Sequence, residues 1–361
     1  MIPATIYMNT TKYTFLDSLR GLAIVMVLIY HLQYLWLPMP KFTESLLIGV
    51  SLFFIISAYT LALSQSTKIQ RKNTWRNFYI RRFFRIYPLF FVVITLLYIL
   101  SFKLHIFSSI YEYVPGRINY ISHVLFVFGF SPDTMNTFHI GEWSLFNELI
   151  FYLLFPLLFI YMKKWWRNTL ILFGASVVIF RIWDIVAFSH SLEPYTQKIF
   201  EWWLYVYHFP LYHLPDFIMG FILFQLHRRW YNKPLNNKIL IPLSIIHLWV
   251  FAYIIYLNTT GIYINHLVRV LLFGMLVWLM MQWWWIYAIL NNKILAYIWK
   301  ISYSLYLLNL PIIFGASAII HHYDFNIIWW SIITIILLFW IASITYIFEI
   351  RWIKFWKKFE R

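Results

Sequence analysis

The stretch YTFLDSLRGLAIVMVLIYHLQYLWL, residues 13–37, carries an arginine near its start and a histidine eleven residues later. A run this long and apolar is predicted to be a membrane-spanning helix. Eleven helical steps of about 100° come within roughly 20° of three full turns, so Arg20 and His31 share one face about 16 Å apart. Both groups are costly in lipid, so this face should look into a protein interior or a wet cavity. Alternatively, Arg20 snorkels to the interface and a neighbouring helix satisfies His31.

The composition is that of a membrane protein. Hydrophobic residues make up 62% of the 361 residues and charged residues only 12%, against about 25% charged residues in soluble proteins. Several apolar runs are about 20 residues long, which favours helices over the roughly 10-residue alternating strands of a barrel. The chain is therefore predicted to be an all-α integral membrane protein in a lipid bilayer. It contains no cysteine, which excludes disulfides and a thiolate nucleophile.

The positions of the cations predict the topology. The loop after residue 66 is rich in them, including Lys68 and Arg71, and this marks the cytoplasmic side. We expect about ten transmembrane helices with both termini in the cytoplasm, at about 13–37, 46–63, 84–103, 143–162, 168–189, 210–227, 238–257, 263–284, 299–319 and 327–348. The segment 104–142 should then lie outside. Its apolar piece, 121–130, is too short to span and should be re-entrant or interfacial.

The net charge of +16 does not predict a nucleic-acid partner. Most cations fall in loops assigned to the cytoplasm, so the charge reports topology, and tryptophan and tyrosine gather near the expected span ends as interfacial residues do. His321 and His322 have no third ligand at a useful spacing, so no metal is expected and a solvated outer turn is the simpler interpretation.

Several short motifs stand in order along nearly the whole chain. They are LDSLRGLA at 16–23 followed by His31, GVSLFFIIS at 49–57, RRFFRIYP at 81–88, WSLFNELIFY at 143–152, LPDFIMG at 214–220, YSLYLLNLP at 303–311 and FEIR at 348–351. Together they resemble the membrane-bound acyltransferase family 3, multi-spanning O-acyltransferases that modify bacterial surface polysaccharides. One Arg-x10-His pair is a weak signal, but ordered matches over most of the chain are a specific one.

The sequence departs from the family pattern at three positions. Ser51 stands where the family often has Asp, Ala58 where its motif usually continues with Gly, and Asn309 where a His is common. Asn309 argues against an ionisable role at that position. The resemblance implies a single acyltransferase-3-like transmembrane domain over residues 1–361, in the stand-alone form without a fused soluble domain.

The resemblance implies O-acyl transfer at the bacterial inner membrane. The expected reaction moves acetyl from cytoplasmic acetyl-CoA to a hydroxyl of a cell-surface or lipid-linked saccharide, such as O-antigen, capsule or exopolysaccharide. An O-succinyltransferase on the same fold is an alternative, because no residue identifies the acyl length. A multi-pass saccharide or acyl transporter without catalysis is another, since it would also use intramembrane charged groups, although no repeated halves are visible. The sequence leaves the acceptor sugar and the oligomeric state undetermined.

His31, Glu148 and Arg20 form the expected catalytic set. Imidazole titrates near neutral pH, which suits His31 as the general base for the acceptor hydroxyl. Glu148 is expected at a similar depth, where it could orient the imidazole and stabilise its cation. Two alternatives stay open: His31 could itself become acylated, and Glu148 could be the structural partner of another buried donor.

Arg81, Arg82 and Arg85 are expected to bind the donor, because guanidinium groups suit phosphate oxygens. Arg81 and Arg82 could equally be topology charges, which makes Arg85, one turn nearer the core, the better candidate. Trp143 and Asp17 are expected substrate-binding residues. Asp17 could instead cap the first turn or pair with an arginine, and Ser144, next to Trp143, could shape the acceptor mouth or cap its helix.

Overall fold

The computed structural model describes residues 14–66, 73–104, 115–138, 141–191, 204–230, 235–260, 265–282 and 292–357. Over these residues the chain is helical and contains no strand. The long helices are α1 (Thr14–His31), α2 (Gly49–Ser66), α3 (Thr74–Leu104), α6 (Glu142–Lys164), α7 (Trp166–Ser191), α9 (Leu214–Trp230), α10 (Asn237–Thr259), α11 (His266–Gln282), α14 (Ser302–His322) and α15 (Ile327–Lys357). Short helical segments accompany them: η1 (Leu32–Leu35), η2 (Lys41–Ile48), α5 (Arg117–Val124), η3 (Phe128–Phe130) and α13 (Lys293–Lys300).

Among the described residues, eight helices are long and apolar enough to cross a membrane. They contain α1, α2, α3, α6, α7, α10, α14 and α15. The other two predicted spans correspond to α9 and α11, which have 17 residues each, fewer than the roughly 20 of a typical span. The all-α integral membrane fold is confirmed, and the cytoplasmic location of the termini stays a prediction. Lys68 and Arg71 of the predicted cytoplasmic loop lie outside the described residues.

The first α-helix is shorter than the predicted span. It ends at His31, η1 continues to Leu35, and Trp36 then takes a left-handed backbone conformation with φ 60°. The second span likewise starts as the 3-10 helix η2 before it becomes α2. The apolar piece 121–130 is divided between the end of α5 and the three residues of η3, so neither helix is long enough to cross a bilayer.

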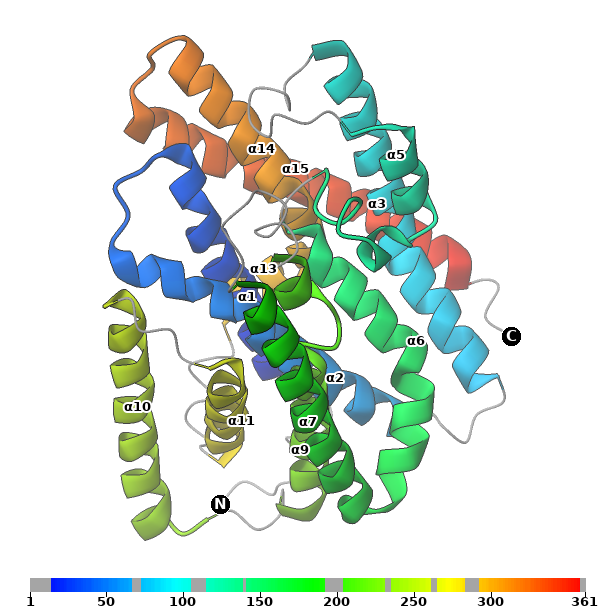
Figure 1. Cartoon of the computed structure of the whole chain (residues 1–361), viewed down its shortest axis with the longest axis vertical. Coiled ribbons are helices and arrows are strands. Elements are labelled where there is room, and N and C mark those ends of the chain that lie inside the picture. Colours follow the sequence, from blue (N-terminus) through cyan, green and yellow to red (C-terminus); the bar gives the residue numbers. More distant parts are fainter. Residues whose placement is uncertain are drawn as a thin grey trace.

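α2 lies at the centre of the bundle (Figure 1). It packs along α1 and α9, and α9 in turn contacts α7 and α11. α14 pairs with α15, which also contacts α3. The most apolar window of the second span is 78% buried, whereas that of α10 is 11% buried and turns apolar side chains such as Ile245 and Trp249 outward. α10 therefore has the surface expected of a lipid-facing helix.

Gly220 sets the close approach of α9 to α2. A Cβ atom added there would lie 2.4 Å from the carbonyl oxygen of Ile55 and 2.5 Å from the Cβ of Ala58. Neither atom can rotate away, so we expect Gly220→Ala to lower the free energy of unfolding by about 1–3 kcal/mol. Thermal unfolding in detergent measures this. Gly174→Ala on α7 is the matched control, because nothing lies within 4 Å of the added Cβ. Equal losses in both variants would contradict the packing argument.

Candidate active site

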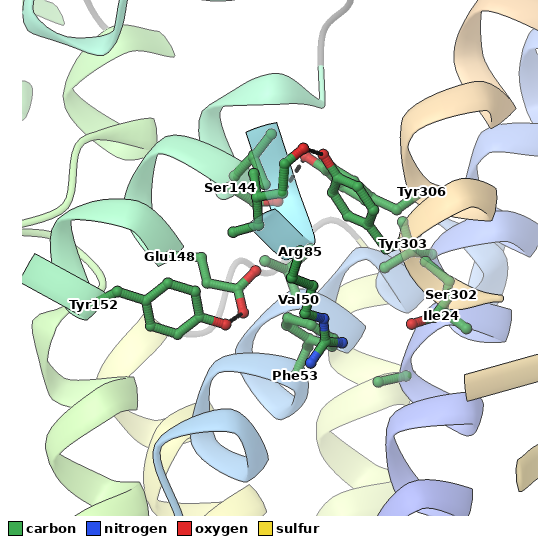
Figure 2. Close-up of a pocket in the computed structure, with 14 residues that line it drawn as sticks. Ile24, Val50, Phe53, Arg85, Ser144, Glu148, Tyr152, Ser302, Tyr303 and Tyr306 are labelled. Atoms are coloured by element: carbon green, nitrogen blue, oxygen red, sulfur yellow. Dashed lines mark hydrogen bonds between the residues drawn. The ribbon is translucent and has the colours of Figure 1, made fainter. Parts of the chain in front are cut away.

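A cavity lies between α1, α2, α3, α6 and α14 (Figure 2). Most of its wall is apolar and includes Ala23, Ile24, Val27, Val50, Phe53 and Leu145. Its polar side chains include two groups, Ser144 and Tyr306 at one end and Arg85, Glu148 and Tyr152 at the other, and Ser302 and Tyr303 also line it. An apolar cavity with a few convergent polar groups is the usual form of a small-molecule site.

Three arginines gather at the second end. The guanidinium groups of Arg20 and Arg85 lie over the ring of Trp299, 4.3 and 5.1 Å from its centroid. That of Arg82 lies 5.2 Å from the ring centroid of Tyr152. Stacking on a ring holds a guanidinium while its N–H edge remains directed at other groups. The Nε atoms of Arg20 and Arg82 are buried without a hydrogen-bond partner, so this end has donors and positive charge suited to an anion.

Of the site residues predicted from the sequence, Arg20 and Asp17 also contact neighbouring side chains, and Arg81 lies outside the cavity wall. Arg20 donates a hydrogen bond to Thr60, and a guanidinium nitrogen lies 3.9 Å from the carboxylate of Asp17. The alternative that Asp17 pairs with an arginine is thus confirmed, while its contact with substrate stays a prediction. Arg81 is half-buried and is not among the residues that line the cavity.

Glu148 faces the arginine end of the cavity. Its carboxylate accepts a hydrogen bond from Tyr152, one turn later on α6, and it lines the same part of the wall as Arg85 (Figure 2). Tyr152 is the buried donor that the alternative interpretation of Glu148 expects, and a role of Glu148 in orienting the His31 imidazole stays a prediction. Counting residues along a helix predicts how deep Glu148 lies in the membrane, but it does not predict the direction in which its side chain points.

His31 is buried at the end of α1, and its Nδ1 lies 2.7 Å from Oδ1 of Asn309 on α14. The Asn309 amide is itself fixed, because Nδ2 donates to the carbonyl oxygens of Leu305 and Tyr306 at 2.9 and 2.7 Å. An amide oxygen only accepts, so Nδ1 of neutral His31 carries the hydrogen and Nε2 carries the basic lone pair. Asn309 therefore sets the tautomer without being ionisable. Val27, one turn before His31, lines the cavity.

The first turn of α6 is tied to α14 at the Ser144 end. Ser144 donates to the hydroxyl of Tyr306 at 2.8 Å, and Tyr306 donates to the carbonyl of Gly141. The interpretation of Ser144 as a helix cap is wrong, since the cap position is Gly141 and no side chain caps it. Two hydroxyl groups thus face the cavity at the end where the neighbouring turn of α14 holds Asn309.

A buried contact between His123 and Glu142 fixes the same turn of α6 from the other side. His123 Nε2 lies 2.8 Å from Glu142, and both side chains are fully buried. His123 Nδ1 lies 2.6 Å from the carbonyl oxygen of Asn119, and Glu142 also accepts from the backbone N–H of Thr137 at 2.8 Å. These bonds fasten segment 117–138 to the start of α6, where Trp143 and Ser144 follow. No local pattern in the sequence predicts this pairing.

Trp143 is buried and stacks on two histidines. Its ring centroid lies 4.4 Å from that of His208 and 5.0 Å from that of His213. Burial lowers the pKa of His208 to about 3, so this ring is neutral at pH 7, and Asn136 donates to its Nδ1 at 3.0 Å. Trp143 is not among the residues that line the cavity. It supports the wall next to Ser144, and its contact with substrate stays a prediction.

Three aromatic residues of the site were not predicted from the sequence. Tyr152 stands four residues after Glu148 in the motif at 143–152. This spacing puts two side chains on one helix face, so their pairing was predictable. Tyr306 also lies within a quoted motif, three residues before Asn309. Trp299, which holds two guanidinium groups, had no distinguishing signal, because tryptophan near a span end is ordinarily interfacial.

Comparison with known proteins agrees with this architecture. The chain is 26% identical over 203 residues to the peptidoglycan O-acetyltransferase OatA of Listeria monocytogenes, covering 52% of this chain and 32% of the relative. It is 33% identical over 151 residues to the O-acetyltransferase OatA of Staphylococcus aureus, covering 39% and 24%. A further protein of Staphylococcus aureus (strain COL) is 28% identical over 341 residues, covering 85% of this chain and 51% of the relative. No solved structure matches the chain.

The matched part of the chain thus spans between about a quarter and a half of these relatives' own length. A family model described as an acyltransferase domain matches residues 13–347. Its span runs from the start of α1 into α15 and includes the arginine cluster, the cavity and the His31–Asn309 contact. Because this match covers nearly the whole sequence, the chain belongs to the membrane-bound acyltransferase family 3 that its motifs resemble.

Proposed function

We propose that this protein is a membrane O-acetyltransferase that moves acetyl from cytoplasmic acetyl-CoA to a hydroxyl of a saccharide outside the bacterial inner membrane. The observation that carries the proposal is the apolar cavity, which has the arginine cluster at one end and includes Val27, one turn before His31, in its wall. The relatives named as O-acetyltransferases support the acetyl group, and the one named as a peptidoglycan O-acetyltransferase supports a saccharide acceptor.

The donor enters from the arginine end. By the positive-inside rule this end faces the cytoplasm, where acetyl-CoA is found. The phosphates of coenzyme A suit the guanidinium groups of Arg20, Arg82 and Arg85. The slender pantetheine arm then lies in the apolar cavity, and the thioester reaches the end lined by Ser144 and Tyr306.

His31 acts as the general base in this scheme. Its Nε2 removes the proton of the acceptor hydroxyl as the hydroxyl oxygen attacks the thioester carbon. The carbon–sulfur bond then breaks, and coenzyme A leaves as the thiol after it takes the proton from the imidazolium. Asn309 holds Nδ1 throughout and is a positioning residue. The hydroxyl groups of Ser144 and Tyr306 line the cavity, but each already donates its hydrogen, to Tyr306 and to the Gly141 carbonyl, so neither is assigned to the developing oxyanion.

The proposal is tested with the full chain in nanodiscs. Release of the coenzyme A thiol is followed with acetyl-CoA or succinyl-CoA, with and without lipid-linked saccharides or peptidoglycan fragments, and the products are identified by mass spectrometry. We expect acetyl-CoA turnover that requires a saccharide and yields an acetyl ester. Faster turnover of succinyl-CoA would replace acetyl as the donor group. Binding of saccharide with no turnover of either thioester would contradict the enzyme and favour a transporter.

A further inference from the structure

A second polar cluster lies outside the cavity, where the segment 204–213 meets the first turns of α9 and α11. It consists of His213, Asp216 and His266, and all three side chains are buried. Asp216 Oδ2 lies 3.1 Å from His213 Nδ1 and 2.8 Å from His266 Nε2. One nitrogen or oxygen of each residue lies within 4.8 Å of those of the other two. Three side chains from two helices and a connecting segment thus converge on one point.

The contacts of His213 are compatible with a cation at this point. Its Nε2 lies 3.2 Å from the carbonyl oxygen of Tyr207 and donates to it in the tautomer with the ring hydrogen on Nε2. The other nitrogen, Nδ1, of a neutral ring then presents its lone pair to the carboxylate oxygen of Asp216 at 3.1 Å. Two lone pairs repel at this distance unless a proton or a metal ion lies between them. A histidine whose second nitrogen donates to a backbone carbonyl is the usual form of a metal ligand.

The surroundings of the Asp216 carboxylate favour a metal ion over a proton between Asp216 and His213. Asp216 is fully buried, and in the described part of the chain no lysine or arginine pairs with it. A proton on His213 would serve Oδ2 only, whereas Oδ1 is also buried and has no hydrogen-bond partner. Both carboxylate oxygens of Asp216 can coordinate one metal ion. The position of Asp216 in the first turn of α9 further favours its ionised form.

We propose that His213, Asp216 and His266 bind one divalent metal ion of the zinc class. Two imidazole nitrogens and a carboxylate are a donor set that zinc prefers. With Oδ1 as a fourth donor the set is closed and buried, which is typical of a structural rather than a catalytic site. The ion would fasten segment 204–213, α9 and α11 together. Because His213 also stacks on Trp143, it would stabilise the wall beside Ser144. The sequence shows only an H-x-x-D spacing, since His266 is distant in the chain.

The test measures metal in the full chain, purified without a histidine tag and without chelators. Inductively coupled plasma mass spectrometry should find about one zinc ion per chain. Asp216→Asn and His266→Gln should lower that content by roughly tenfold or more. His247→Gln is the matched control, because His247 is a buried histidine on α10 outside the cluster, and this variant should keep the metal.

Chelation of the native protein gives an independent readout. Treatment with 1,10-phenanthroline should lower the unfolding temperature by at least about 3 °C, and zinc chloride should restore it. Asp216→Asn should show neither change. Native protein that is isolated without metal, and whose unfolding temperature does not respond to zinc chloride, would overturn the proposal and assign a proton to His213. Neither measurement uses acyl transfer, so the two proposals fail or succeed separately.

Discussion

His31→Asn is expected to lower acetyl transfer by about 10²- to 10⁴-fold, the usual contribution of a general base. Asparagine suits the test better than alanine. Its side-chain N–H can still donate to Asn309 Oδ1, so no buried oxygen of that contact loses its partner, a loss that would otherwise cost about 1–3 kcal/mol. The change thus removes the proton acceptor and keeps the contact between α1 and α14. Turnover is measured as thiol release at equal folded yield and equal unfolding temperature.

Asn309 provides the companion variants. Asn309→Ala removes the oxygen that holds His31 Nδ1, so the lone pair can move to either ring nitrogen, and kcat should fall while KM for the donor stays nearly constant. Asn309→Asp keeps an acceptor at the same position and should retain more activity than Asn309→Ala. Turnover by His31→Asn at the native rate would remove His31 from the mechanism. Equal activities of the two Asn309 variants would show that the tautomer is not what Asn309 contributes.

The helices were predictable from the sequence because the bilayer imposes a simple rule on it. Every span must be apolar over about 20 residues, since an unpaired backbone group in lipid is costly. Local deviations were not predictable. α1 ends at His31, and the next turn is a 3-10 helix although the apolar pattern continues. α9 and α11 are shorter than typical spans.

The site was predictable in its residue types but not in its pairings. The Arg20–His31 spacing correctly put an ionisable pair on a protein-facing side, because Arg20 contacts Thr60 and His31 contacts Asn309. The partner of His31 lies 278 residues away in the sequence, and no local pattern gives such a distance. Glu148 was assigned to His31 because both are ionisable and near one depth. Depth along a helix is set by residue count, whereas the direction of a side chain depends on how the helices pack.

Arg85→Ala is expected to raise the KM for acetyl-CoA by roughly 10- to 100-fold, which corresponds to about 1.5–3 kcal/mol for a hydrogen bond to a charged group. Arg85 lines the cavity, and its guanidinium stacks on Trp299 beside that of Arg20. Arg85→Lys keeps the charge but loses the planar fork and the stacking, so its KM should be intermediate. Arg76→Ala on the same helix is the matched control, because Arg76 is exposed and lies outside the cavity wall.

A comparison of two acyl donors distinguishes phosphate binding by Arg85 from a structural role of Arg85. Acetyl-CoA carries the nucleotide phosphates, whereas acetylpantetheine carries the same thioester without them. If Arg85 binds phosphate, its loss raises the KM for acetyl-CoA and leaves that for acetylpantetheine unchanged, so the preference of the native protein for acetyl-CoA should nearly disappear in Arg85→Ala. If Arg85 instead holds Trp299 and the cavity wall in place, both donors lose activity by the same factor. That second result would assign the phosphates to Arg20 and Arg82, whose Nε atoms are buried without a hydrogen-bond partner.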